Sequence, residues 1–223
     1  MELSLARLRK SPVTQIVSLG MRCATAYNLR RHFHFRTAFP FDWWVTPLEG
    51  LNALLSISLN IDEIYASQNL ELTEKAKSVR HKASDVRLHH EFPRQVAVIG
   101  APVRQNFLQH VEKPRLRTQH LVDRFLALND ARERILFVRE QNLSSLVQAD
   151  VISASTQLSR LFPNPEWTLA WIQGPEEEAK FGWKGDPLSW DGVLSGLDIT
   201  IDESRHLPFI DDPAPIANED VYE

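Results

Sequence analysis

The sequence predicts an α/β fold in which a partly parallel sheet is covered by helices. Short apolar runs alternate with helical patterns, and this alternation is clearest from residue 130 onward. Three runs are too short for helices and are expected to form central strands, at Ile16–Leu19, Ile135–Val138 and Thr168–Ile172. A chain of 223 residues is long enough to bury one complete core. We therefore expect one domain over residues 1–223, with an N-terminal arm at 1–12 and a flexible acidic tail at 208–223.

Composition places the chain among soluble globular proteins, because 43% of its residues are hydrophobic and 24% are charged. The net charge of −4 argues against a nucleic-acid-binding protein. No apolar run approaches the roughly 20 residues that span a bilayer, and no signal peptide is evident. We therefore expect a cytoplasmic protein that binds neither nucleic acid nor membrane.

The cysteine and histidine content limits the chemistry further. A single cysteine excludes an internal disulfide framework and a multi-cysteine zinc site. The eight histidines show no spacing typical of metal ligands. The glycine-rich fingerprints of dinucleotide-binding and ATP-binding loops are also missing. The sequence therefore predicts no metal ion and no cofactor.

The first predicted helix, Ala24–Phe33, follows the first strand directly and places Ala26, Leu29 and Phe33 on one face. The Trp- and Gly-rich stretch 181–196 is expected to be irregular. Further helices are expected at Pro47–Leu59, Pro114–Asp130 and Leu146–Phe162, and further short strands at Ser78–Arg80, Val86–His90 and Leu197–Ile201. The apolar run Val96–Ile99 is expected to be either a strand or an insertion packed against the body.

Cys23 is the candidate nucleophile, because it lies just past a strand and at the start of a helix. The amides at a helix N-terminus stabilise negative charge, and a thiolate is often presented there. The same position also suits a small buried cysteine that packs a strand–helix joint. Position alone leaves both interpretations open.

Asp42 is the one carboxylate in the aromatic sequence Phe39–Trp44. A carboxylate in an apolar setting must be hydrogen-bonded or ion-paired, or have a raised pKa. Arg22, Arg30 or Arg36 could be its partner. We favour a structural clasp, in which an arginine or backbone amides hold Asp42 beneath the Cys23 helix, over direct catalysis.

Three motifs carry a resemblance to a known family. The pattern in the first 45 residues consists of Ser18, Leu19, Gly20, Cys23, Ala26, Leu29 and Arg30, followed by Pro40 to Trp43. It resembles a bacterial family catalogued as papain-like cysteine peptidases, formerly a domain of unknown function. His89-His90-Glu91-Phe92 looks like that family's H-D-F motif, with glutamate in place of aspartate, and Ile135–Arg139 looks like its F-V-R strand. The resemblance extends from about Gln15 to about Trp190.

The resemblance implies a cysteine hydrolase, a peptidase or an acyl or amide transferase, with Cys23 as nucleophile and His90 as its base. Asp42 is a candidate for the group that orients the base, and Glu91, Glu140 and Asn142 are alternatives. Oxyanion donors would come from the backbone amides around Arg22 and Cys23. The family name also implies an alternative fold, a papain-like α+β fold whose helical half carries the cysteine and whose antiparallel half carries the histidine.

A second interpretation is a non-hydrolytic protein of a glycan pathway that binds a sugar-phosphate or a nucleotide-sugar. Arg22, Arg30 and Arg139 could hold a phosphate, and Trp43, with Trp44 and Trp183, could stack on a sugar or a base. In that case Cys23 would be a packing residue. A third interpretation is a structural partner protein that uses exposed aromatic residues as an interface. The sequence leaves the substrate open between a small molecule, a glycan and a peptide, and it leaves the oligomeric state open.

Overall fold

A three-stranded parallel sheet forms the centre of the protein. The computed structural model describes residues 12–96, 101–143, 146–176 and 179–210. Strands β1 (Gln15–Ser18), β5 (Arg134–Glu140) and β6 (Glu166–Ile172) lie in the order β1-β5-β6, and both pairings are parallel. All three strands that the sequence predicts at these positions are therefore confirmed, with β5 in the middle of this sheet and β1 and β6 on either side of it.

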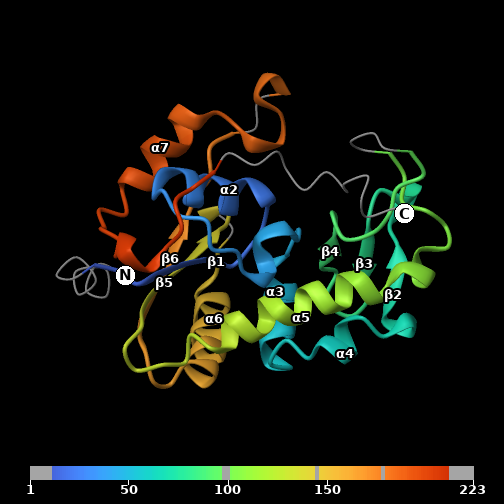
Figure 1. Ribbon diagram of the computed structural model, residues 1–223, viewed down its shortest axis with the longest axis horizontal. Coiled ribbons are helices and arrows are strands. Elements are labelled where there is room, and N and C mark those ends of the chain that lie inside the picture. Colours follow the sequence, from blue (N-terminus) through green and yellow to red (C-terminus); the bar gives the residue numbers. More distant parts are fainter. Residues whose placement is uncertain (1–11, 97–100, 144–145, 177–178, 211–223) are drawn as a thin grey trace.

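Helices cover both faces of this sheet, as Figure 1 shows. Helices α2 (Cys23–His32) and α7 (Pro187–Ser195) lie on one face, and α3 (Leu48–Ser56), α5 (Glu112–Leu126) and α6 (Gln148–Leu161) lie on the other. Successive side chains of a strand point to opposite faces. Accordingly, Phe137 of β5 packs in the core under α3, α5 and α6, and Val138 packs in the core under α2 and α7.

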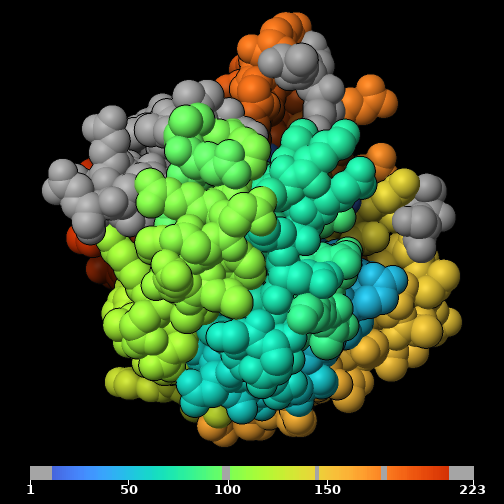
Figure 2. Space-filling view, turned by 90° about the vertical axis from the view of Figure 1, so that its right-hand side faces the viewer, coloured from blue at the N-terminus to red at the C-terminus, as the bar shows by residue number. Residues whose placement is uncertain are grey.

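A small antiparallel sheet lies beside the parallel one (Figure 1). It consists of β2 (Leu70–Leu72), β3 (Val79–His81) and β4 (Arg87–Leu88), and the short helix α4 (Ile61–Ile64) precedes it. Helix α5 runs along both halves, and Figure 2 shows that it and the antiparallel half form one continuous face at this end of the molecule. The architecture is thus α/β with a second antiparallel sheet, which is also consistent with a papain-like α+β fold.

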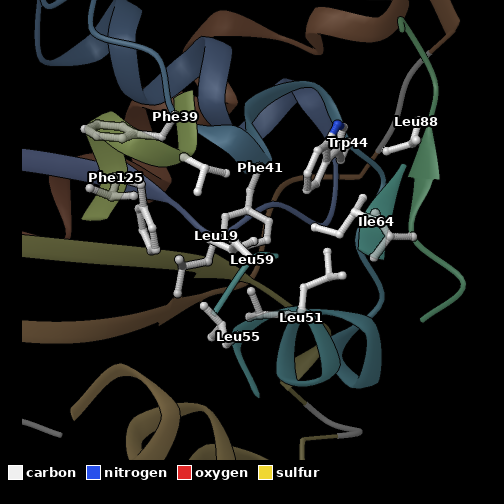
Figure 3. Close-up of a cluster of buried hydrophobic side chains, with 14 of the residues drawn as sticks. Leu19, Phe39, Phe41, Trp44, Leu51, Leu55, Leu59, Ile64, Leu88 and Phe125 are labelled. Atoms are coloured by element: carbon white, nitrogen blue, oxygen red, sulfur yellow. The ribbon is translucent and has the colours of Figure 1, made fainter. Parts of the chain in front are cut away.

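The aromatic segment around Asp42 joins the two halves. Phe41 contacts Trp44, with ring centroids 5.8 Å apart, and Phe125 of α5, at 6.0 Å. In Figure 3, Phe41 lies in the middle of a buried cluster, with Trp44 on one side and Phe125 on the other. The same cluster contains Leu19, which follows β1, and Leu88 of β4. One continuous core therefore extends from the parallel sheet to the antiparallel sheet.

The structure differs from the sequence predictions in several places. Helix α7 forms within the stretch that was expected to be irregular, because Pro187 begins it and the Asp186 side chain accepts hydrogen bonds from the amides of Leu188 and Ser189. The expected strand Leu197–Ile201 is reduced to a single bridge between Ile201 and Val13. Strand β2 was not predicted as a strand.

Other predicted segments lie partly or wholly outside the described residues, namely the arm, the tail beyond residue 210 and most of Val96–Ile99. Short 3-10 helices complete the described structure: η1 (Pro40–Trp43), η2 (Ser67–Asn69), η3 (Glu74–Ala76), η4 (Phe107–His110), η6 (Ala179–Lys184) and η7 (Glu203–Arg205). No helix within the described part of the chain is long and apolar enough to cross a membrane.

Candidate functional site

A tight elbow leads from β1 into the helix that carries Cys23. Gly20 and Met21 both have positive φ angles, 77° and 85°. A side chain at Gly20 would place its Cβ 2.9 Å from the Thr46 hydroxyl, so this turn needs glycine for space as well as for its backbone angle. Arg22 is extended, and Cys23 is then the first residue of α2, which begins without a side-chain cap. The predicted placement of the cysteine at a helix start is confirmed.

The Cys23 thiol is buried, with only 8% of the residue exposed. Burial raises the pKa of Cys23 to about 12, and the nearby carboxylates of Asp42 and Glu91 act in the same direction. The Cys23 backbone amide and the Arg30 guanidinium lower the pKa but do not offset burial. The structure therefore contains a neutral thiol at physiological pH, and not a preformed thiolate.

Asp42 lies in η1, beneath the Cys23 helix. Its Oδ2 accepts hydrogen bonds from the Arg30 guanidinium of α2 and, at 3.2 Å, from the backbone amide of Phe39. Burial raises the pKa of Asp42 to about 6, although Arg30 opposes the rise. The predicted clasp of an arginine and a backbone amide is present, and it ties η1 to α2.

His90 lies in the turn that follows β4, because the predicted strand Val86–His90 ends at Leu88. Its ring packs at right angles to His89, with centroids 4.7 Å apart, and edge-on to Trp43 at 6.1 Å. Burial lowers the pKa of His90 to about 3, and the charges of His89, Arg94 and Arg117 add to this. The imidazole is therefore neutral at physiological pH.

Trp43 connects the cysteine helix to the histidine turn. The Arg30 guanidinium lies over its ring, 5.1 Å from the centroid, and His90 packs against the same ring. Within the described residues, however, no hydrogen bond joins the Cys23 thiol to an imidazole. Trp43 thus contacts Arg30, on the helix that Cys23 begins, and the ring of His90, but no contact between Cys23 and His90 is found in the described part of the chain.

The three carboxylates among the four candidates for an orienting group, Asp42, Glu91 and Glu140, have other partners. Glu91 is buried, and its carboxylate accepts hydrogen bonds from Trp44 Nε1, at 3.2 Å, and from the Arg117 guanidinium. Glu140 is buried and accepts from Arg22 and Thr25. Neither of these carboxylates, nor Asp42, forms a hydrogen bond with His90 in the part of the chain that the structure describes.

The three arginines proposed as phosphate ligands are engaged within the protein. Arg139 is completely buried and donates to the carbonyl oxygens of Leu19, at 2.9 Å, and Thr46, at 2.7 Å. Arg22 pairs with Glu140, and Arg30 pairs with Asp42. Each of the three guanidinium groups therefore already has a hydrogen-bond partner within the protein.

A row of aromatic rings that includes Tyr27, a residue the sequence did not single out, lies along the Cys23 face of α2. Tyr27 packs edge-on against Trp183, at 5.3 Å, and against Phe209, at 5.9 Å. Lys184 lies 4.5 Å from the Tyr27 ring centroid. Tyr27 follows Cys23 by four residues, so helical spacing could have placed it on the same face, but its partners come from more than 150 residues away.

A groove of about 430 Å³ lies elsewhere, between α6 and the outer strand β6. Its lining is mostly apolar and includes none of the predicted site residues: Leu143, Leu146, Val151, Ser155, Trp167, Thr168, Leu169 and Trp171. The groove lies on the face of the sheet opposite to α2, so it is not part of the Cys23 junction.

Comparison with known proteins agrees with the motifs that the sequence carries. A family model described as "putative papain-like cysteine peptidase" matches residues 14–158, which is more than half of the chain and includes Cys23, Asp42 and His90. No curated protein and no solved structure shows significant similarity to the chain. The match to the family model establishes that the chain belongs to this papain-like cysteine peptidase family.

Proposed function

We propose that the protein is a cysteine hydrolase or acyl transferase in which Cys23 is the nucleophile and His90 is the base. The observation that carries this proposal is that Cys23 and His90 come from different halves of the fold. Cys23 begins a helix of the parallel-sheet half, His90 follows a strand of the antiparallel half, and Trp43 contacts elements of both. Nucleophile and base on opposite walls of a junction can receive a substrate between them.

The two groups start as a neutral pair. The thiol, with a pKa of about 12, keeps its proton, and the imidazole, with a pKa of about 3, carries none, so substrate binding has to bring the two pKa values together before the proton can pass between them. The reaction then follows general-base catalysis: the sulfur attacks the substrate carbonyl carbon as the imidazole takes the thiol proton. The imidazolium returns that proton to the leaving group, and a thioester on Cys23 remains. Water, or another acyl acceptor, releases the acyl group with the same imidazole as base.

The start of α2 supplies the electrostatic stabilisation for this step. Its first amides have no side-chain cap, and they point beyond the N-terminus of a ten-residue helix. An oxyanion that forms next to the Cys23 sulfur would accept hydrogen bonds from these amides. Substrate binding must also bring His90 within hydrogen-bond reach of the sulfur, a contact that tightens in many enzymes only when the substrate is bound.

The test uses p-nitrophenyl acetate as an activated acyl donor and mass spectrometry of the intact protein. We expect an acetyl thioester on Cys23 that is absent from Cys23→Ser. His90→Ala should slow acylation by about 100-fold or more, since general-base catalysis contributes on this scale. His34→Ala, which removes an exposed histidine, is the control and should acylate as the wild type does. Acylation of His90→Ala at the wild-type rate would contradict the role of His90.

The alternative proposal is a non-hydrolytic protein that binds a sugar-phosphate or a nucleotide-sugar. The aromatic row favours it, because Trp43 lies 6.2 Å from Trp183, and Trp183 packs on Tyr27. The engaged arginines weigh against it, since a phosphate would have to displace Asp42 or Glu140. Calorimetric titration with UDP-glucose decides between the two: binding that survives Cys23→Ser and disappears in Trp183→Ala supports this alternative.

A further inference from the structure

The last two residues of β5, Arg139 and Glu140, hold the elbow that leads from β1 to Cys23. One side chain does so from each face of the sheet. Because strand side chains alternate, Arg139 points to the face of α3, α5 and α6, and Glu140 points to the face of α2 and α7. Both side chains are buried, Arg139 completely and Glu140 with 3% of the residue exposed. From the sequence, Arg139 was a candidate phosphate ligand and Glu140 an alternative orienting group.

Arg139 fixes the strand end of the elbow. Its guanidinium donates to the carbonyl oxygen of Leu19, just before the left-handed turn, and to that of Thr46. The Thr46 amide in turn donates to the carbonyl oxygen of Met21, at 3.4 Å. Met21 has a φ of 85°, which is costly for a residue with a side chain and persists only where the surroundings hold it.

Glu140 fixes the helix end of the elbow. One carboxylate oxygen accepts from the guanidinium of Arg22, the residue before Cys23, and the other accepts from the hydroxyl of Thr25, two residues after it. Charge-assisted bonds of this kind are stronger than neutral ones. Gly174 packs so closely on this network that a Cβ there would meet both the Glu140 carboxylate and the Arg22 guanidinium. The network therefore brackets Cys23 on both sides along the chain.

We infer that Arg139 and Glu140 are positioning residues for Cys23, which hold the strained elbow so that the thiol and the first amides of α2 face the same point. This inference rests on the proposed function for its catalytic meaning. Its physical content, the placement of the thiol, can be measured without any substrate. Neither side chain needs to touch the substrate for this role.

The chain offers a matched control at the other end of β5. Glu133 precedes that strand, is also buried, and accepts hydrogen bonds from one threonine and one arginine, Thr14 and Arg205. The chemical composition of the two clusters is the same, but the Glu133 cluster lies at the end of the sheet opposite to the elbow. Comparison of Glu140→Gln with Glu133→Gln therefore separates a loss of positioning from a loss of general stability.

The experiment measures the rate at which iodoacetamide alkylates Cys23, the only cysteine of the sequence, as a function of pH. Each variant is measured at a temperature equally far below the midpoint of its own thermal unfolding. In Glu140→Gln, where the elbow no longer holds the thiol in place, we expect alkylation at pH 8 to be about tenfold faster than in the wild type. The midpoint of the alkylation rate against pH should shift toward the ordinary thiol pKa of roughly 8.5. Acylation by p-nitrophenyl acetate should fall about tenfold in the same variant. Glu133→Gln should show the wild-type profile in both assays.

A second pair of variants keeps the test decisive if Glu140→Gln does not fold. Thr25→Val should reproduce the faster alkylation, Thr25→Ser should restore the wild-type profile, and Thr14→Val should have no effect on it. If Thr25→Val or Glu140→Gln alkylates with the same pH profile as its control, the positioning role is wrong. If the wild type shows no acylation at all, the proposed function fails, and the alkylation profiles still decide whether Glu140 positions the thiol.

Discussion

Asp42 of η1 and Arg30 of α2 form a buried ion pair that joins the aromatic segment to the cysteine helix. Both side chains are at least 92% buried, so solvent screens their interaction little. The pair also lies within electrostatic reach of the Cys23 thiol, which responds to both charges. It therefore couples the stability of this junction to the protonation state of its groups.

Removal of this carboxylate should destabilise the protein. Asp42→Ala leaves the Arg30 cation buried without its partner, and we expect the free energy of unfolding at pH 8 to fall by about 3 kcal/mol. Urea denaturation followed by tryptophan fluorescence measures this change. Asp191→Ala is the control, because Asp191 pairs with Arg31 of the same helix at a site that is only partly buried, and its loss should cost about 1 kcal/mol or less. Equal costs for the two variants would argue against a clasp at Asp42.

The pH dependence of stability should carry a signature of Asp42. Its pKa in the folded protein, about 6, lies above the ordinary value of 3.8, mainly because of burial. The folded state therefore binds this proton more tightly, and the associated stability is present below pH 3.8 and lost as the pH rises through 6. The wild type should lose up to about 3 kcal/mol relative to Asp42→Asn between pH 4 and pH 7. A constant difference across this range would contradict the raised pKa.

His90 should act in the opposite direction. Its pKa in the folded protein is about 3, below the ordinary value of 6.5, and burial is the main cause. The unfolded chain binds a proton near pH 6.5 and the folded protein does not, so stability is lost as the pH falls from 6.5 toward 3. His90→Gln should reduce this acid loss by at most about 1.4 kcal/mol per pH unit, and by less where solvent reaches the ring. An unchanged acid slope in His90→Gln would contradict the lowered pKa of His90.

Gly174 should not tolerate a side chain. A Cβ at this position would collide with the Glu140 carboxylate and the Arg22 guanidinium, so Gly174→Ala must break or displace the ion pair. We expect a loss of about 2 kcal/mol or more in the free energy of unfolding. Gly192→Ala in α7 is the counterpart, because nothing lies within 4 Å of its added Cβ and alanine favours a helix by about 1 kcal/mol. If Gly174→Ala were no less stable than Gly192→Ala, the Glu140 network would have to accommodate the added methyl group.

The sequence by itself determined the elements whose signals are local. Apolar runs of four or five residues predicted β1, β5 and β6, since a buried strand needs apolar side chains on both faces. Local sequence also predicted that Cys23 lies at the start of a helix and that an arginine or backbone amides hold Asp42. Helix α7 was missed because its content of tryptophan and glycine obscured the capping residue Asp186 and the proline that begins it.

The tertiary structure alone decided which charged groups meet, because their partners are far apart in the chain. Arg22 and Thr25 reach Glu140 across 118 and 115 residues, and Arg139 reaches Leu19 across 120. No periodic pattern encodes such pairings, since they follow from parallel strands that bring their carboxyl ends to one edge of the sheet. Burial, which sets the pKa of Cys23 and His90, likewise depends on the packing of both halves around Trp43.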